Sequence, residues 1–181
     1  MTRHLVALGR ERVAFIRGPS GNGDAEARLR GYREALRDGG AESRPEWVFD
    51  GDFQKGAGLA AVERLRAMTP RPDALFASND SMAIAAMSAL REAGLRVPED
   101  VAVTGFDDIP VARFMSPALT TVRVDIAGLG ARAVRTLIHA VAHRNEHARV
   151  RETLATTLVV RASCGAQVVG PKAGERQAVA R

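Results

Sequence analysis

Cysteine is almost absent from the sequence, and features that mark several classes of protein are missing. The single cysteine, Cys164, cannot form a disulfide within the chain, which favours a reducing, cytoplasmic compartment. No apolar run approaches the roughly 20 residues that a membrane-spanning helix needs. The first residues, MTRHLVALGRER, contain only a short apolar stretch and no small-residue cleavage site, so no signal peptide and no membrane partner are predicted.

Aromatic residues and runs of positive charge are also scarce. Aromatic residues make up 4% of the chain, too few for a series of platforms that stack single-stranded nucleic acid. The net charge of +5, from 26 Lys and Arg against 21 Asp and Glu, could suggest a nucleic-acid partner. However, the arginines are interleaved with acids and no five basic residues are consecutive. A solvated, arginine-rich surface explains this charge without a DNA-contacting face in these residues.

Residues that would support catalysis or metal binding form no coherent pattern. The sequence shows no Ser-His-Asp set, metal-ligating cluster or Gly-rich phosphate loop. His139, His143 and His147 recur four residues apart, but no Cys, Asp or Glu accompanies them at ligand spacing. Cations near a helix C-terminus are the simpler explanation of these histidines. The sequence therefore predicts a protein that is not an enzyme and that uses no metal or cofactor.

What the sequence does contain is an alternation of short β-branched segments and longer segments with helical period. Strands are expected at 12–17, 46–50, 73–77 and 101–105, and helices at 24–37, 54–68 and 81–93. Strands that alternate with helices predict an α/β fold with one parallel sheet and helices on both faces. Apolar residues make up 46% of the chain, enough for one sizeable core.

The rhythm changes after residue 106. A loop to residue 118, an extended segment at 119–124, a helix at 126–141 and a strand at 152–161 are expected. The last residues, rich in Gly, Ala and charge, predict a disordered tail. The inward face of the late helix is predicted to carry Ile126, Leu129, Ala133, Leu137 and Val141.

Polar or aromatic side chains follow each of the four expected parallel strands. They include Arg28, Phe53, Asn79 and Asp107. Ligands of open parallel sheets bind in the crevice beyond the carboxyl ends of the strands. An aromatic ring can stack on the apolar face of a sugar, while Arg, Asn and Asp hydrogen-bond its hydroxyls. This edge therefore predicts a site for a small polyhydroxylated or otherwise polar molecule.

Each of these residues also has a purely structural interpretation. Asn79 could cap the third helix, and Asp107 could form a turn. Phe53 could belong to the core. Arg28 lies near the start of a helix, where the macrodipole disfavours a cation, and could simply point to solvent. Their common position at one edge of the sheet is what favours a binding site.

Five segments, in this order and at this spacing, resemble the effector-binding domain of LacI/GalR-type bacterial transcriptional repressors. They are GRERVAFIRGP, ARLRGYREAL, DALFASNDSMAIAAM, GLRVPEDVAVTGFDDIPVARFMSPALTTVRVD and TLVVRASCG, within residues 2–165. The resemblance implies the C-terminal lobe of a type I periplasmic-binding-protein-like fold. In these terms 1–10 end a helix of the N-terminal lobe, and 11–118 form the C-terminal sensor lobe. Residues 119–165 return to an incomplete N-terminal lobe, and 166–181 are the tail.

The same resemblance implies roles for residues and partners. A small effector would bias operator binding through a DNA-reading headpiece absent from this chain, and the protein would be a homodimer. Effector contacts are implied for Arg28, Phe53, Asn79 and Asp107, with Asp24 as a less consistent contact. An exported sugar-binding protein shares the two-lobed fold and is the alternative, against which the missing signal peptide argues.

One uncharged segment, SMAIAAMSAL, independently favours self-association. A helix that is apolar all round is buried all round, here on the sheet on one side and on a partner on the other. The resemblance implies that the partner is the same helix of a second copy. Met82, Ala86 and Met115 are the predicted interface residues, with burial under the chain's own loops as the alternative.

Overall fold

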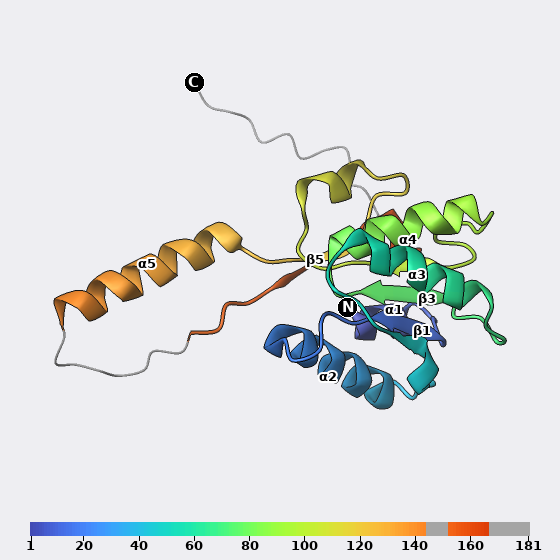
Figure 1. Ribbon diagram of the computed structural model, residues 1–181, viewed down its shortest axis with the longest axis horizontal. Helices are drawn as coiled ribbons and strands as arrows, with labels where there is room; N and C mark the ends of the chain where they lie inside the picture. The colour runs from blue at the N-terminus through green and yellow to red at the C-terminus, as the bar shows by residue number, and fades with distance from the viewer. Residues whose placement is uncertain (144–151, 167–181) are drawn as a thin grey trace, which may run out of the picture.

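The computed structural model describes residues 1–143 and 152–166, which form a parallel sheet with helices on both faces and a projecting arm (Figure 1). The sheet consists of β1 (Val13–Ile16), β2 (Val48–Phe49), β3 (Ala74–Ala77) and β4 (Ala102–Thr104), in the order β2-β1-β3-β4. All three pairings are parallel. The predicted sheet is confirmed. Strand β2 is shorter than expected because the 3-10 helix η1 (Pro45–Trp47) takes up the start of that segment, and proline suits a first helical turn.

Two pairs of helices cover the sheet. Helices α1 (Thr2–Ala7) and α2 (Gly23–Asp38) lie on one face, and α3 (Lys55–Arg66) and α4 (Asp80–Glu92) lie on the other (Figure 1). Strand β1 shows how the sequence serves both faces, since successive side chains of a strand point to opposite sides. Val13 and Phe15 pack towards α2, whereas Ala14 and Ile16 pack towards α3 and α4. All four are buried, as expected of a strand inside a parallel sheet.

Particular contacts fix each layer. On the α2 side, the Tyr32 ring stacks on Phe15 at 4.9 Å between centroids, and its hydroxyl donates a 2.7 Å hydrogen bond to the Val13 carbonyl. On the other side, α3 and α4 approach closely because residue 58 is glycine. A Cβ added to Gly58 would lie 2.2 Å from the Met82 carbonyl oxygen. Only glycine allows this backbone approach.

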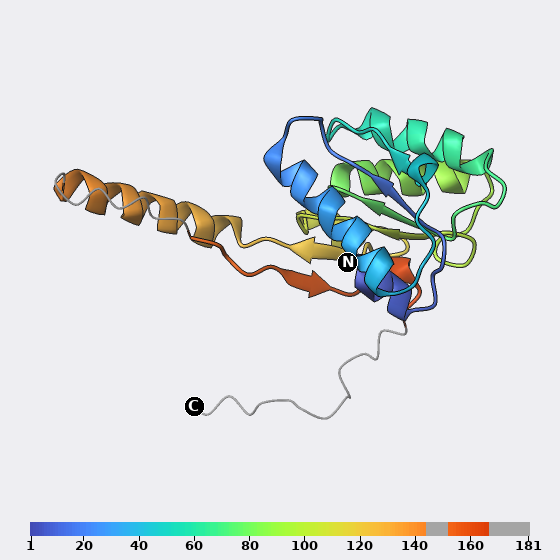
Figure 2. The same cartoon turned by 90° about the horizontal axis from the view of Figure 1, so that it is seen from below.

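The chain returns along the edge of the sheet before it leaves the lobe. After the 3-10 helix η2 (Pro110–Phe114), Thr120 forms a parallel bridge with Thr104 next to β4. Strand β5 (Thr121–Arg123) then pairs antiparallel with β6 (Thr157–Val159), which is shorter than the predicted strand at 152–161 and is followed by η3 (Ala162–Cys164). Figure 2 shows β5 and β6 running side by side between the lobe and the helix α5.

Helix α5 (Ile126–Ala142) forms where the sequence predicts it, but its apolar face is not turned inward. None of its residues is buried, and its apolar side chains, such as Leu137 at 64%, are largely exposed. The expected inward packing of Ile126, Leu129, Ala133, Leu137 and Val141 is therefore not observed. The reason is that α5 stands away from the sheet (Figures 1 and 2), so the described residues offer this stripe no surface to pack against. His147 and the predicted tail beyond residue 166 lie outside the described residues.

Two hydroxyls at the ends of β3 and β4 give a first testable prediction. Ser78 Oγ and Thr104 Oγ1 are buried and have no hydrogen-bond partner among the residues that the structure describes. Replacing a buried, unpaired hydroxyl by a methyl group of similar shape removes a desolvation penalty. Thr104→Val should therefore raise the free energy of unfolding by about 1 kcal/mol, measured by urea denaturation. Thr120→Val is the matched control and should destabilise the protein, because the Thr120 hydroxyl bonds both the carbonyl and the N–H of Arg161.

Candidate ligand-binding site

Arg28 of α2 lies between two aromatic rings at the carboxyl edge of the sheet. Its guanidinium carbon lies 4.0 Å from the centroid of the Phe106 ring and 5.9 Å from that of Phe53. Phe53 follows β2, and Phe106 follows β4, so three separate elements meet here. A guanidinium over an aromatic face is a favourable cation–π arrangement. The structure thus brings Arg28 and Phe53 together, as the sequence predicted, and adds Phe106.

The position of Phe53 is fixed by its neighbours. Its ring lies over Gly18 at the end of β1, where an added Cβ would be 2.3 Å from the ring. Its carbonyl accepts a 2.9 Å hydrogen bond from Nδ2 of Asn79, while Oδ1 of Asn79 accepts a 2.9 Å bond from the Met82 N–H. Asn79 therefore caps α4, as its structural interpretation proposed, and also holds Phe53.

Asp107 supplies a carboxylate to the same edge. It is half-buried, and burial raises its pKa, an effect that the positive charge of Arg28 opposes. Its N–H donates a 2.8 Å hydrogen bond to the Val122 carbonyl, which fixes the loop after β4 onto β5. The edge therefore presents a cation, an anion and two ring faces, a set suited to a polar ligand with apolar faces.

Backbone strain is concentrated at this edge. Among the residues that the structure describes, the non-glycine residues with positive φ are Phe53 at 65°, Asp107 at 112° and Asp108 at 57°. Such conformations cost free energy in L-residues and cluster at functional sites, where they place side chains for binding. Two of these three residues were chosen from the sequence as ligand contacts, and the third is their neighbour.

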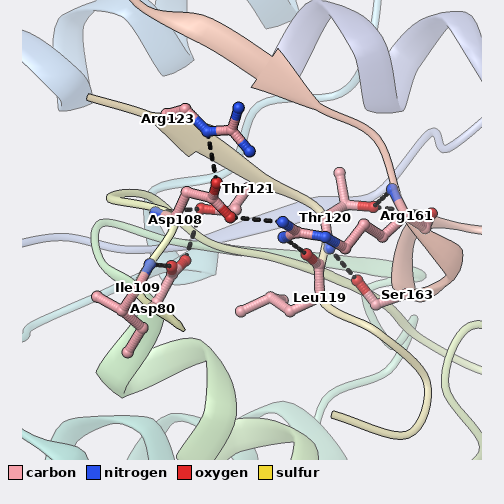
Figure 3. A network of polar contacts seen from close by, with 9 residues as sticks. All are labelled: Asp80, Asp108, Ile109, Leu119, Thr120, Thr121, Arg123, Arg161 and Ser163. Carbon is pink, nitrogen blue, oxygen red and sulfur yellow. Dashed lines mark hydrogen bonds and ion pairs between the residues drawn. The ribbon is translucent and has the colours of Figure 1, made fainter. Parts of the chain in front are cut away.

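Asp80 is a buried carboxylate beside the loop that follows β4 (Figure 3). Its Oδ1 accepts a 2.6 Å hydrogen bond from the Thr121 hydroxyl, and its Oδ2 accepts a 2.9 Å bond from the Ile109 N–H. The pKa of Asp80 is raised to about 6, mainly by burial and to a smaller extent by the nearby charges of Asp107 and Asp108, while these two hydrogen bonds oppose the rise. Gly105 is required beside it, since an added Cβ would lie 2.1 Å from Oδ1.

The remaining predicted residues lie elsewhere. Asp24 is exposed one turn before Arg28 on α2, at the margin of the site. Met82 and Ala86, predicted at a dimer interface, have no exposed surface, because both pack in the core between α4 and the sheet. In this conformation they cannot touch a second chain. Met115 instead borders a surface cavity of about 500 Å³ that Ile84 on the outer side of α4 also lines.

Sequence reasoning missed several residues of this region. Phe106 could have been found, because it follows β4 as Phe53 follows β2. Arg123 and Arg161, which both bond Asp108, gave no local signal: they are 15 and 53 residues from it in the sequence. Such pairs become visible only when β5 and β6 are placed beside the loop.

Neither a membrane-spanning helix nor a metal-ligating cluster occurs among the described residues. No helix in them is long and apolar enough to cross a membrane. No group of three or more His, Cys, Asp or Glu side chains in the same residues could hold a metal ion.

Comparison with known proteins identifies the family. Residues 2–164 match the family described as periplasmic binding protein-like domain. The chain belongs to this family. The fold predicted from the sequence is therefore confirmed, with the parallel sheet and flanking helices in place.

The relatives of this periplasmic binding protein-like domain are LacI-type regulators, which confirms the resemblance seen in the sequence. The chain is 38% identical over 152 residues to the HTH-type transcriptional repressor PurR of Mannheimia succiniciproducens. The match covers 84% of this chain and 45% of that protein. The chain thus spans about half the length of the curated relatives it matches.

Solved structures give the same picture. A complex of the transcriptional regulator CelR with cellobiose is 40% identical, with a TM-score of 0.85 over 90% of this chain and 49% of that one. A putative transcriptional regulator LacI from Bacillus cereus subsp. cytotoxis is 31% identical, with a TM-score of 0.86 over 90% of this chain and 57% of that one.

Proposed function

We propose that this chain is the ligand-sensing part of a LacI-type transcriptional regulator and binds a small, polar, sugar-like effector. The effector would lie at the carboxyl edge of the sheet against Arg28, Phe53, Asn79 and Asp107, with Asp24 at the margin. Binding in this arrangement would be non-covalent. The rings would contact apolar faces of the ligand, while the charged and amide groups would hydrogen-bond its hydroxyls.

One observation carries this proposal. Arg28 lies 4.0 Å from the Phe106 ring and 5.9 Å from the Phe53 ring, and near enough to the Asp107 carboxylate for its charge to lower the pKa of Asp107. The backbone is strained at Phe53 and Asp107. Three elements of the fold supply these groups to one edge: α2, the loop after β2 and the loop after β4. The core alone does not require a strained loop with a half-buried carboxylate, whereas a preorganised binding site does.

We also propose how the effector controls DNA binding, as the similarity to LacI-type regulators suggests. In the complete regulator, the effector would favour one relative orientation of two lobes, and this would change the affinity of a separate headpiece for operator DNA. By linkage, operator DNA would change the affinity for effector by the same factor. This chain would sense the ligand and would contact DNA only through that headpiece.

Calorimetric titration of the complete regulator tests the proposal. Cellobiose, glucose and adenosine are suitable probes, because the first two offer vicinal hydroxyls and the third adds a flat base for the aromatic rings. Saturable binding of one of them, lost in a variant of the site, would support the proposal. An intact, folded regulator that binds no small polar ligand would refute it.

We further propose that the regulator is a homodimer whose interface includes the surface cavity between α4 and the loop before β5. The lining is largely apolar, which suits a second copy of this chain related by two-fold symmetry. Its apolar lining includes Ile84, Met87, Leu95, Val97, Met115 and Pro117, and the charged residues Arg91, Arg96 and Glu99 also line it.

A charged substitution tests this interface. Ile84→Glu should convert the dimer to a monomer in sedimentation equilibrium, because a buried, unpaired carboxylate costs several kcal/mol at an apolar interface. Leu59→Glu is the matched control: Leu59 is 46% exposed on α3 and does not line the cavity, so the dimer should persist. Dimers of equal stability in both variants would place the interface elsewhere.

A further inference from the structure

Asp108 is held by two arginines from distant parts of the chain. Its carboxylate is only 8% exposed. Oδ2 accepts a 2.7 Å hydrogen bond from Nε of Arg123, and Oδ1 accepts a 2.6 Å bond from Nη2 of Arg161 (Figure 3). Burial alone would raise the pKa of Asp108, but these two partners lower it, so the group stays ionised.

One arginine ends β5 and the other follows β6, the two strands that lie between the lobe and α5. Arg123 is the last residue of β5, and Arg161 follows β6 closely. These strands pair antiparallel, so that β5 leads from the lobe towards α5 and β6 leads back to the lobe (Figure 2). Arg161 is itself anchored, since it donates a 2.7 Å bond to the Leu119 carbonyl. One carboxylate therefore joins the loop after β4 to both strands.

The same loop carries Asp107, and its backbone is fixed residue by residue. The N–H of Asp107 bonds the Val122 carbonyl at 2.8 Å, and the N–H of Asp108 lies 3.4 Å from the Thr121 hydroxyl oxygen. The N–H of the next residue bonds Asp80, which in turn accepts from Thr121. The position of Asp107 is thus set by β5, and Asp108 adds the only charged contact to that strand found among the described residues of the loop.

We propose that Asp108 is a positioning residue that couples the ligand-binding loop to β5 and β6 through Arg123 and Arg161. Displacement of the two strands relative to the lobe would move Asp107, and a ligand that holds Asp107 would favour one position of the strands. This inference rests on the proposed function, because it assigns a route by which the effector at that site acts on the rest of the regulator.

The test uses Arg123→Gln as its main variant. The Arg123 side chain is 57% exposed, so its loss should leave thermal unfolding nearly unchanged. Arg123→Lys retains the positive charge, so its exchange rate and its Kd should lie between those of Arg123→Gln and the wild type. Arg12→Gln is the matched control: Arg12 forms a 3.0 Å pair with Asp73 and is 36% exposed, but it lies next to the amino end of β1, away from the loop. Asp108→Asn is a second variant that removes the shared carboxylate.

Two readouts are measured. In the ligand-free protein, hydrogen exchange of the Asp107 N–H should become roughly tenfold faster in Arg123→Gln and Asp108→Asn, and should not change in Arg12→Gln. In the complete regulator, the Kd for cellobiose should rise roughly tenfold in the same two variants and remain at the wild-type value in the control.

The outcomes separate this inference from the proposed function. Wild-type protection of the Asp107 N–H in both variants would show that Asp108 does not position the loop, and would overturn the inference. Altered exchange with an unchanged Kd would also overturn it, because loop position would then not be coupled to binding. A wild-type regulator that binds neither cellobiose nor the other probes would defeat the proposed function, while the exchange experiment would still decide the role of Asp108.

Discussion

Replacing Arg28 by alanine in the complete regulator should abolish the response to effector and leave the fold intact. The substitution removes the guanidinium that lies against Phe106 and near Phe53, together with the hydrogen bonds that it would donate to the proposed ligand. Hydrogen bonds to charged groups contribute about 1.5–3 kcal/mol each, so affinity should fall by roughly tenfold to more than a hundredfold. Calorimetry measures the affinity, and thermal unfolding followed by circular dichroism checks the fold.

Asp107→Ala should have the same phenotype, because the carboxylate faces the same edge and is neutralised in part by Arg28. Arg30→Ala is the matched control, an exposed arginine two residues further along α2 whose loss should not affect binding. If the regulator with Arg28→Ala and the regulator with Asp107→Ala both respond normally, the site has been assigned to the wrong residues.

The stability of the domain should depend on the protonation of Asp80. Burial raises the pKa of Asp80 in the folded state to about 6, from an ordinary value of 3.8. The folded state therefore binds this proton more tightly than the unfolded state does. Its stabilising contribution is complete below about pH 4 and is lost as the pH rises through 6. At about 1.4 kcal/mol per pKa unit, the loss is on the order of 3 kcal/mol.

Asp80→Asn isolates this effect. Asparagine stays neutral, can still accept from the Ile109 N–H, and can donate to the Thr121 hydroxyl. The free energy of unfolding of the variant minus that of the wild type, from urea denaturation at pH 4 and pH 7, should increase by on the order of 3 kcal/mol over that range. Parallel pH profiles for the two proteins would mean that Asp80 does not titrate there. Asp108 does not mask the result, because its pKa is lowered and its contribution is lost only at more acid pH.

Most of the fold could be predicted because the sequence periods are local. The four strands of the sheet and the helices between them stand close to the predicted positions, since buried apolar runs and amphipathic stripes are set by neighbouring residues. What failed depended on surfaces that periodicity does not show. The apolar face of α5 predicts burial, but no local pattern shows whether another part of the molecule packs against it. In α4, uncharged composition could not separate Met82 and Ala86, which face the sheet, from Ile84, which faces outward.

The candidate site was predictable to the extent that it follows strand ends. Arg28, Phe53, Asn79 and Asp107 share one edge because parallel strands end on one side, a property of topology that the sequence reveals. The bonds that hold these side chains were not predictable. The left-handed backbone at Phe53 and Asp107, and the arginines around Asp108, come from packing between segments that are far apart in the chain.

The close crossing at Gly58 has a mechanical consequence. Helix α3 begins two residues after Phe53, and its glycine rests on the backbone of α4 at Met82, with the Cβ of Ala85 beside it. Because two backbones in such close contact cannot easily slide past one another, we expect α3 and α4 to move as one unit. This unit would connect the Phe53 ring, over the edge of the sheet, to Ile84 on the outer side of α4. Any larger residue at position 58 would force α3 and α4 apart.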